Sequence, residues 1–244
     1  MESQMKPIIY WAGDSTVKQN DITSFPQSGI GQGFSLYIKK GIFIDNRAEN
    51  GRSTKSFIEE GILDTISKDI KEGDFLFIQF GHNDEKPDAE RHTEAFGSYQ
   101  ENLKTYIKTA TDKGAYPVLI TSLYRRLFQE DGKTLIEGTH ENYPEAMIAV
   151  GKECQVPVID LCTLSKALIE KNGPEISKRW FLHVPAGRYA NFPDGKADNS
   201  HLTYEGCVVF SGLIAAELRK LGGVYAEILL PLNEEKENPA LLID

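Results

Sequence analysis

The stretch YWAGDSTVKQ, residues 10–19, ends an apolar run and then turns sharply. The run that closes at Ala12 reads as a buried strand, and Gly13 and Ser15 follow it within three positions. A glycine and a serine placed here fit an ordinary tight turn, and they also fit a nucleophile held at the edge of a sheet. The rest of the chain has to decide between these two interpretations.

The composition is that of a globular protein of ordinary polarity. The chain has 244 residues, of which 40% are hydrophobic and 26% charged, and this length allows one large domain or two small ones. The formal net charge of −9 would repel nucleic-acid phosphates and anionic membrane surfaces. We therefore expect a soluble protein with no nucleic-acid partner and no membrane partner.

The cysteines and histidines predict neither a disulfide framework nor a metal centre. An odd and sparse cysteine count is typical of a reducing compartment, and the chain has no CxxC pair. The spacing of the remaining histidines is not that of metal ligands. We therefore expect no metal and no cofactor, and structural or supporting roles for Cys154, Cys162, Cys207, His82, His140 and His183.

The N-terminal segment MESQMKPIIYW has no apolar stretch of signal-peptide length before the first expected strand. No other run reaches the roughly 20 apolar residues of a membrane span. These features predict a cytoplasmic protein, although a secreted protein whose leader had been removed would look the same.

Apolar runs and helical stripes alternate along the chain. Most of the runs are continuously apolar, which is typical of parallel strands covered on both faces. The expected strands are Ile8–Ala12, Ile42–Asp45, Phe75–Phe80, Val118–Ser122 and Val156–Leu161. The helical stripes lie at 58–70, 96–110, 143–154, 164–169 and 210–221, the last ending at Gly222. This alternation predicts one domain over residues 1–244, a three-layer α/β/α sandwich around a five-stranded parallel sheet.

Three segments depart from the alternation. A hairpin insertion is expected at about 125–140, because Asp131-Gly132 is a strong turn signal between two short apolar runs. Residues 171–202 are rich in Gly, Pro, Arg and aromatics and predict a long irregular loop at the active site. Residues 223–244 form a C-terminal extension.

Polar residues of distinct chemistry follow several of the expected strands. In an open parallel sheet, ligands bind outside the carboxyl ends of the strands. Ser15 follows the first strand, Gly51 the second and Asn83 the third, and Asp198 and His201 lie just before the last helix. Each signal alone is more often an ordinary turn or cap. All of them together, in a usable order at one end of the sheet, favour a serine hydrolase.

Acyl transfer needs this set of groups. A serine hydroxyl is a weak nucleophile and requires a base such as His201, which Asp198 would orient and stabilise as an imidazolium. The oxyanion that forms needs preorganised donors, and the N–H groups of Ser15 and Gly51 with the Asn83 carboxamide supply three. Removing one such donor typically raises the barrier by about 3–4 kcal/mol.

The four blocks resemble those of the SGNH (GDSL-type) hydrolases. The blocks are GDST with Ser15, NRAENGRS with Gly51, GHND with Asn83, and DNSH with Asp198 and His201. GDSTV, QFGHND, YPEAM and DNSHLTYEG are most similar to the rhamnogalacturonan acetylesterase branch. The resemblance implies a flavodoxin-like fold and hydrolysis of acetyl esters on a carbohydrate without a metal. It also implies the Ser15–His201–Asp198 triad and the oxyanion hole of Ser15, Gly51 and Asn83.

Aromatic and arginine side chains near the expected site fit a carbohydrate ligand. Aromatic faces stack on sugars, and guanidinium groups bind uronic carboxylates in a bidentate manner. The aromatics would equally anchor a long loop to the core, and the arginines would equally pair with the acidic surface. The candidates for substrate contact are Arg125, Arg126, Trp180, Arg188, Tyr189 and Phe192.

The sequence therefore favours a serine esterase that removes acetyl groups from an acetylated poly- or oligosaccharide of the pectin or rhamnogalacturonan type. A lipase or thioesterase of the same family, acting on longer acyl esters, is one alternative. A catalytically silent carbohydrate-binding module on this fold is another. The sequence leaves a homodimer open.

Overall fold

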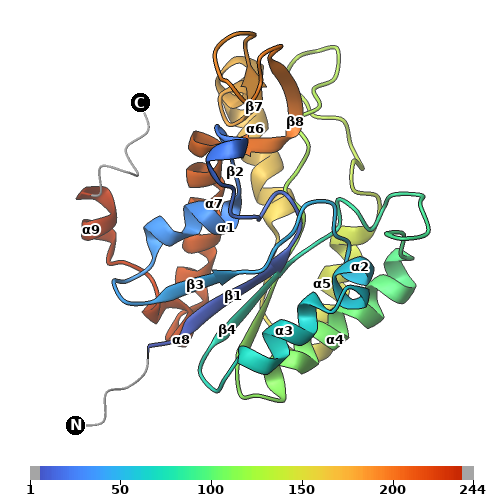
Figure 1. The fold of residues 1–244 in the computed structure, drawn as a ribbon, viewed down its shortest axis with the longest axis vertical. Coiled ribbons are helices and arrows are strands. Elements are labelled where there is room, and N and C mark those ends of the chain that lie inside the picture. Colours follow the sequence, from blue (N-terminus) through green and yellow to red (C-terminus); the bar gives the residue numbers. More distant parts are fainter. Residues whose placement is uncertain (1–5, 238–244) are drawn as a thin grey trace.

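The structure, a computed structural model, describes residues 6–237 and is built on a sheet of five parallel strands. The strand order is β3-β1-β4-β5-β6, so β4 is central and β1 and β5 flank it (Figure 1). All five expected strands are present, although the last is shorter than expected. Their bounds are β1 Ile8–Gly13, β3 Phe43–Asn46, β4 Phe75–Gln79, β5 Tyr116–Ile120 and β6 Val158–Ile159.

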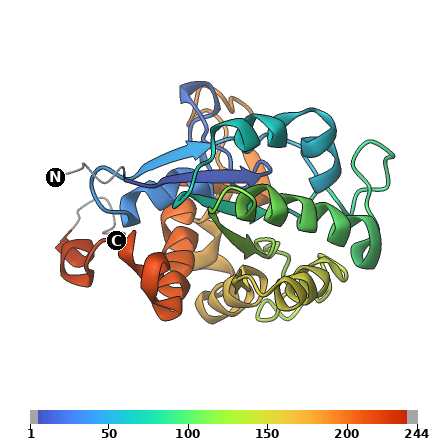
Figure 2. The ribbon, with the colours of Figure 1, turned by 90° about the horizontal axis from the view of Figure 1, so that it is seen from below.

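Helices cover both faces of this sheet and confirm the predicted α/β/α sandwich. On one face lie α1 Ile30–Gly33, α6 Leu161–Lys178 and α7 Tyr204–Leu221. On the other lie α2 Thr54–Glu59, α3 Ile62–Asp69, α4 Gln100–Thr111 and α5 Tyr143–Cys154 (Figure 2). Shorter elements are η1 Ile22–Ser24, η2 Phe34–Tyr37, η3 Ala95–Tyr99, α8 Gly223–Glu227 and α9 Leu232–Glu237. Within residues 6–237, no helix has the length and apolar character needed to cross a membrane.

The side chains of β1 explain why both faces of the sheet are covered. Successive residues of a strand point to opposite faces. Ile9 and Trp11 pack into the core beneath α1 and α7, whereas Tyr10 and Ala12 pack into the core beneath α2 to α5. All four are at most 2% exposed. A strand buried on both faces cannot alternate between apolar and polar residues, which accounts for the continuous apolar runs of the sequence.

A small antiparallel sheet stands beyond the carboxyl ends of the parallel strands (Figure 1). Its order is β2-β8-β7, with bounds Gln27–Ser28, Lys196–Thr203 and Phe181–Val184. Leu202 of β8 and Phe181 of β7 are fully buried in the same core as α7. The inner face of the small sheet is therefore anchored to the sandwich, which fixes the position of β8 above the main sheet.

The prediction of one irregular loop over 171–202 is wrong for most of that segment. α6 continues to Lys178 across a break at Gly173, where φ is +71°, and β7 and β8 follow it. Only the connection 185–195 between the two strands is irregular. β8 could not be recognised in the sequence, because KADNSHLT contains a single buried residue and so has no alternation of apolar and polar residues.

Two further expectations need correction. The segment 125–140 reverses direction as expected, but it forms only an isolated bridge between Phe128 and Leu135 rather than two strands. The single helical stripe at 58–70 is two helices, α2 and α3, because Gly61 adopts a φ of +74° between them. A left-handed residue breaks the helical hydrogen-bond ladder even where the apolar periodicity continues.

The C-terminal extension packs against its own chain as far as it is described. Between α8 and α9, the Leu230 N–H donates a hydrogen bond to the Tyr37 carbonyl at 2.8 Å. This contact joins the extension to η2 at the edge of the sandwich. Residues 238–244 of the expected extension lie outside the described residues.

Candidate active site

The turn that carries Ser15 begins where β1 ends. Gly13 is required there for space, because a Cβ atom would lie 3.0 Å from the Gln79 carbonyl of neighbouring β4. The buried Asp14 carboxylate then accepts hydrogen bonds from the Thr16 N–H at 2.9 Å and from the Thr16 hydroxyl at 2.8 Å. This tight turn holds Ser15, which is half-buried, at the carboxyl edge of the sheet.

His201 connects Ser15 to Asp198. Its Nε2 lies 2.9 Å from Ser15 Oγ, and its Nδ1 lies 2.8 Å from Asp198 Oδ2. Because a carboxylate only accepts hydrogen bonds, Nδ1 carries the proton and Nε2 is left as an acceptor for the serine hydroxyl. Ser15 and His201 are 186 positions apart, so only the tertiary fold creates this hydroxyl–imidazole–carboxylate arrangement.

The environment of the pair Asp198 and His201 favours the charged form of both. Burial of the Asp198 carboxyl opposes its ionisation, but hydrogen bonds from the His201 ring and from the N–H groups of His201 and Ser200 hold its pKa well below the ordinary value. In return, the hydrogen bond to Asp198 raises the pKa of His201 above 6.5, against the opposing effect of burial. An imidazole with this partner takes up a proton readily.

Gly51 and Asn83 lie on loops at the same edge of the sheet. The loop after β3 is joined to the end of β1 by a hydrogen bond from the Glu49 N–H to the Gly13 carbonyl, and Gly51 has a φ of +77°. Asn83 follows β4, and its Nδ2 donates to the Arg52 carbonyl at 3.1 Å. The structure thus brings Ser15, Asp198 and His201 into direct contact and links the Gly51 and Asn83 loops to each other beside them.

Named relatives match nearly the whole chain. A rhamnogalacturonan acetylesterase from Bacillus subtilis is 44% identical over 218 residues, which cover 89% of this chain and 92% of the relative. This chain belongs to the rhamnogalacturonan acetylesterase family. A second Bacillus subtilis protein, named a probable rhamnogalacturonan acetylesterase, is 37% identical over 93% of this chain and 95% of its own length. No model of a known protein family matches the chain.

This chain shares its fold with solved structures that include carbohydrate esterases and a GDSL-like protein. The Bacillus subtilis protein YxiM superposes with a TM-score of 0.76 at 29% identity, over 89% of this chain and 57% of that chain. An acetylxylan esterase mutant from Geobacillus stearothermophilus has a TM-score of 0.61 at 12% identity, over 92% of this chain and 98% of that chain. A protein named a putative GDSL-like lipase, from Parabacteroides merdae, has a TM-score of 0.59 at 16% identity, over 85% of this chain and 93% of that chain.

Arg91 fixes the orientation of the Asn83 carboxamide in this family member. Its Nη1 donates to Asn83 Oδ1 at 3.2 Å, and Asp88 holds the guanidinium through an ion pair of 2.6 Å. With one Nδ2 hydrogen on the Arg52 carbonyl, the second Nδ2 hydrogen stays available as a donor. Sequence reasoning missed Arg91, because it lies in a polar segment without periodicity.

Asp84 ties the Gly51 and Asn83 loops together from below. Its carboxylate, which is 0% exposed, accepts hydrogen bonds from the Thr54 N–H at 3.0 Å, the Thr54 hydroxyl at 2.5 Å and the Thr93 hydroxyl at 3.1 Å. Thr54 is the first residue of α2 and directly follows the Gly51 loop. The hydrogen bonds of Asp84 with Thr54 and Thr93, called the Asp84 clasp below, therefore lie beneath both loops. Burial raises the pKa of Asp84 to about 7, although the threonine hydrogen bonds oppose that shift.

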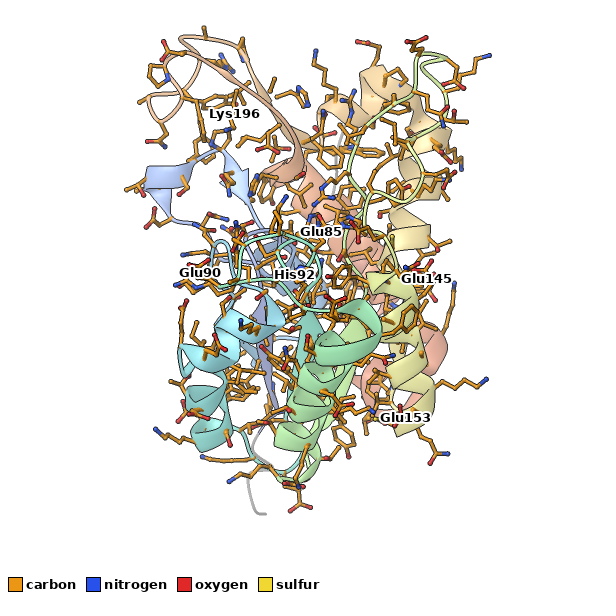
Figure 3. All side chains as sticks on the ribbon, turned by 90° about the vertical axis from the view of Figure 1, so that its right-hand side faces the viewer. Glu85, Glu90, His92, Glu145, Glu153 and Lys196 are labelled. Carbon is orange, nitrogen blue, oxygen red and sulfur yellow. The ribbon has the colours of Figure 1, made fainter. Side chains whose placement is uncertain are left out.

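Arg125 and Arg126 are occupied by internal contacts. Arg125 donates to the Thr139 carbonyl and pairs with Glu85, which lies where the loops above the sheet meet α5 (Figure 3). Arg126 donates to Ser177 Oγ and Asn199 Oδ1, both at 3.0 Å, and to the Pro174 carbonyl. These bonds hold the segment after β5 against α6 and β8.

The other predicted substrate residues lie around β7 and the connection that follows it. Trp180 is 5% exposed and packs edge-on against Phe210 at 5.8 Å. Arg188, Tyr189 and Phe192 belong to the connection 185–195, where Arg188 is exposed and the two aromatics are half-buried. Contact with substrate remains a prediction for all six residues. Among the described residues, no group of three or more His, Cys, Asp or Glu side chains is arranged to hold a metal ion.

The clasp predicts how two substitutions of Asp84 differ. Asp84→Ala leaves the buried donors of Thr54 and Thr93 without an acceptor, so we expect the free energy of unfolding to fall by about 3 kcal/mol. Asp84→Asn retains an oxygen for those donors and should lose much less. Chemical denaturation of the two variants and the wild type measures both effects, and equal stabilities of the two variants would contradict the clasp.

The raised pKa of Asp84 also predicts a pH dependence. Because the folded value of about 7 lies above the ordinary 3.8, this carboxyl contributes its full stability at low pH and loses it as the pH rises through the folded value. Asp84→Asn cannot ionise, so its stability relative to the wild type should improve between about pH 4 and about pH 7. Denaturation at several pH values tests this, and a constant difference would contradict it.

Proposed function

We propose that this chain is a serine esterase that removes acetyl groups from an acetylated poly- or oligosaccharide of the rhamnogalacturonan type. The observation that carries the proposal is the contact of Ser15 with His201, and of His201 with Asp198, in a chain 44% identical to a named rhamnogalacturonan acetylesterase. The roles assigned below to individual residues are part of the proposal.

Acylation begins with the Ser15 hydroxyl. Its proton passes to His201 Nε2 while Oγ attacks the carbonyl carbon of the acetyl ester, which forms a tetrahedral oxyanion. Collapse of this intermediate breaks the bond to the sugar oxygen, and that oxygen takes the proton from Nε2 as it leaves. The products of this half-reaction are a free sugar hydroxyl and an acetyl group on Ser15.

Deacylation repeats these steps with water. Nε2 of His201 accepts a proton from the water as its oxygen attacks the acetyl carbon, and it returns the proton to Ser15 Oγ when acetate leaves. Throughout, Asp198 stabilises the imidazolium and keeps the ring in one tautomer. The oxyanion of each intermediate is bound by the N–H groups of Ser15 and Gly51 and by the free Nδ2 hydrogen of Asn83.

The first experiment measures kcat/KM for p-nitrophenyl esters of increasing acyl length. We expect p-nitrophenyl acetate to be the best of these esters, because the acyl group that the proposed reaction removes from the sugar is small. Ser15→Ala should lower kcat by about 10⁴-fold or more while the protein remains folded. Activity that peaks at long acyl chains would reject the acetylesterase in favour of the lipase or thioesterase alternative. Sugar binding without turnover by the wild type would favour the silent binding module.

The second experiment follows the pH dependence set by His201. The ring must be neutral to accept the Ser15 proton, and Asp198 raises its pKa, so kcat/KM should rise with pH through an apparent pKa above 6.5. Asp198→Asn removes the charge that stabilises the imidazolium and should move the His201 titration to lower pH. Titration of the ring by NMR in both proteins provides the measurement. A His201 pKa that is the same in the two proteins would contradict the assigned partnership.

A further inference from the structure

Residues 198–201 form a wide bulge in β8. Phe181 of β7 pairs with Leu202 of β8. His183, two residues further along β7, pairs with Ala197, which is five residues from Leu202. The residues between these two pairs therefore leave the ladder with β7. A bulge re-aims side chains, but it also removes the strand pairing that would hold its residues in place. Other contacts have to fix the position of this bulge.

The bulge is held together by its own hydrogen bonds. One Asp198 oxygen accepts from the N–H groups of Ser200 at 2.8 Å and His201 at 2.9 Å. The other oxygen accepts from His201 Nδ1 at 2.8 Å. These bonds close the turn and keep the imidazole against its carboxylate, so the proposed base and its partner form one unit. The distance from this unit to Ser15 is set by contacts with other parts of the chain.

Arg126 and His183 bind the bulge through Asn199. The Arg126 N–H donates to the Asn199 carbonyl at 2.9 Å, and its Nη1 donates to Asn199 Oδ1 at 3.0 Å. His183 Nε2 lies 2.8 Å from the same Oδ1. Because an arginine only donates, the carboxamide atom that faces it is the oxygen, and the His183 nitrogen that shares this oxygen carries a proton. Asn199 therefore connects the bulge to the segment after β5 and to β7 (Figure 1).

Arg126 is itself held by α6. Its Nε donates to Ser177 Oγ at 3.0 Å, and its Nη2 donates to the Pro174 carbonyl. The Ser177 hydroxyl in turn donates at 2.6 Å to the carbonyl of Gly173, where α6 is broken. The guanidinium is 8% exposed and its side-chain and carbonyl acceptors are neutral, so burial lowers the pKa of Arg126. A cation buried among neutral groups costs stability, and such groups concentrate where a function requires their geometry.

We propose that Arg126, acting through Asn199, is a positioning residue that holds His201 at bonding distance from the nucleophile. This role needs no contact between Arg126 and the substrate. The inference rests on the proposed esterase function and adds to it a residue outside the triad and the oxyanion hole. It also explains why Arg126 is buried between α6 and β8, at the back of the bulge.

The test replaces both ends of this connection. Arg126→Met keeps the length of the side chain and removes its donors, and Asn199→Leu keeps the size of the side chain and removes its acceptor. Both should lower kcat for p-nitrophenyl acetate by about tenfold to about a hundredfold, the effect of a small misplacement of reacting groups. Because His201 serves both half-reactions, both steps slow together, and KM should change by less than about twofold. Asn199→Asp retains the acceptor oxygen and should keep most of the wild-type kcat.

Titration of His201 by NMR separates misplacement of the base from damage to it. The titratable groups that act on this ring lie on β8, on the turn after β1 and after β4, and are Asp198, Lys196, Asp14 and His82. Arg126→Met and Asn199→Leu leave these groups and the bonds within the bulge in place. The His201 pKa should therefore stay above 6.5, as in the wild type, while kcat falls.

Arg219→Met is the matched control. Arg219 also anchors a segment, by donating to the Leu230 carbonyl at 2.9 Å, but it lies near the C-terminal end of α7, whereas β8 leads into the N-terminal end. Its replacement should lower the melting temperature and leave kcat unchanged. If Arg126→Met does not fold, the pair Asn199→Leu and Asn199→Asp is sufficient for the test.

The outcomes separate this inference from the proposed function. A lower melting temperature with unchanged kcat in Asn199→Leu would assign the connection a structural role and overturn the inference. A His201 pKa lowered as far as in Asp198→Asn would also overturn it, because the base itself would then be damaged. If Ser15→Ala abolishes activity and Asn199→Leu does not reduce it, the esterase stands and the positioning role is wrong. If the wild type releases acetate from no ester, the proposed function fails and the inference falls with it.

Discussion

The ring of His201 is the point on which the site depends. It bonds Ser15 Oγ at 2.9 Å and Asp198 at 2.8 Å; Ser15 is 186 positions away in the sequence, whereas Asp198 lies three residues before His201 on the same strand. Ser15 stands at the end of a strand buried on both faces, and His201 stands on a small sheet anchored by Leu202 and Phe181. Both supports are core structures, so the contact depends on the packing of the whole sandwich rather than on one flexible loop.

Polar groups beneath the site hold its loops in position, and the burial of some of these groups lowers the stability of the fold. Asp84 holds the Gly51 and Asn83 loops through Thr54 and Thr93, and the partly exposed Arg91 orients the Asn83 amide. Burial raises the pKa of Asp14 and lowers the pKa of His82, and Asp14 Oδ2 and His82 Nε2 have no hydrogen-bond partner among the described residues. Such groups are uncommon in folded cores and concentrate at functional sites, where geometry takes precedence over stability.

The sequence predicts those parts of the fold that follow from burial on both faces. The strands β1, β4 and β5 are apolar because helices cover both of their faces, whereas the edge strand β3 is partly exposed. The residues that follow the strands fall at one edge of the sheet because the strands are parallel. β8 could not be predicted from the sequence, because its polar residues contribute to the site and to pairing with neighbouring strands and do not form a hydrophobic face. The Asp84 clasp could not be predicted because Thr54 lies 30 positions before Asp84 and no periodicity relates the two. Arg91 lies only eight positions after Asn83, but no sequence pattern relates these two residues.

The identity of the acylated residue is the most direct test of the proposed mechanism. The enzyme is mixed with excess p-nitrophenyl acetate, quenched in acid within the first turnovers, digested and examined by peptide mass spectrometry. A Ser15 nucleophile predicts one acetyl group on the peptide that contains Ser15, and no acetylation there when His201→Ala is treated in the same way. Acetate release by an enzyme that never carries acetyl on Ser15, or acetylation at another residue that keeps pace with turnover, would contradict it.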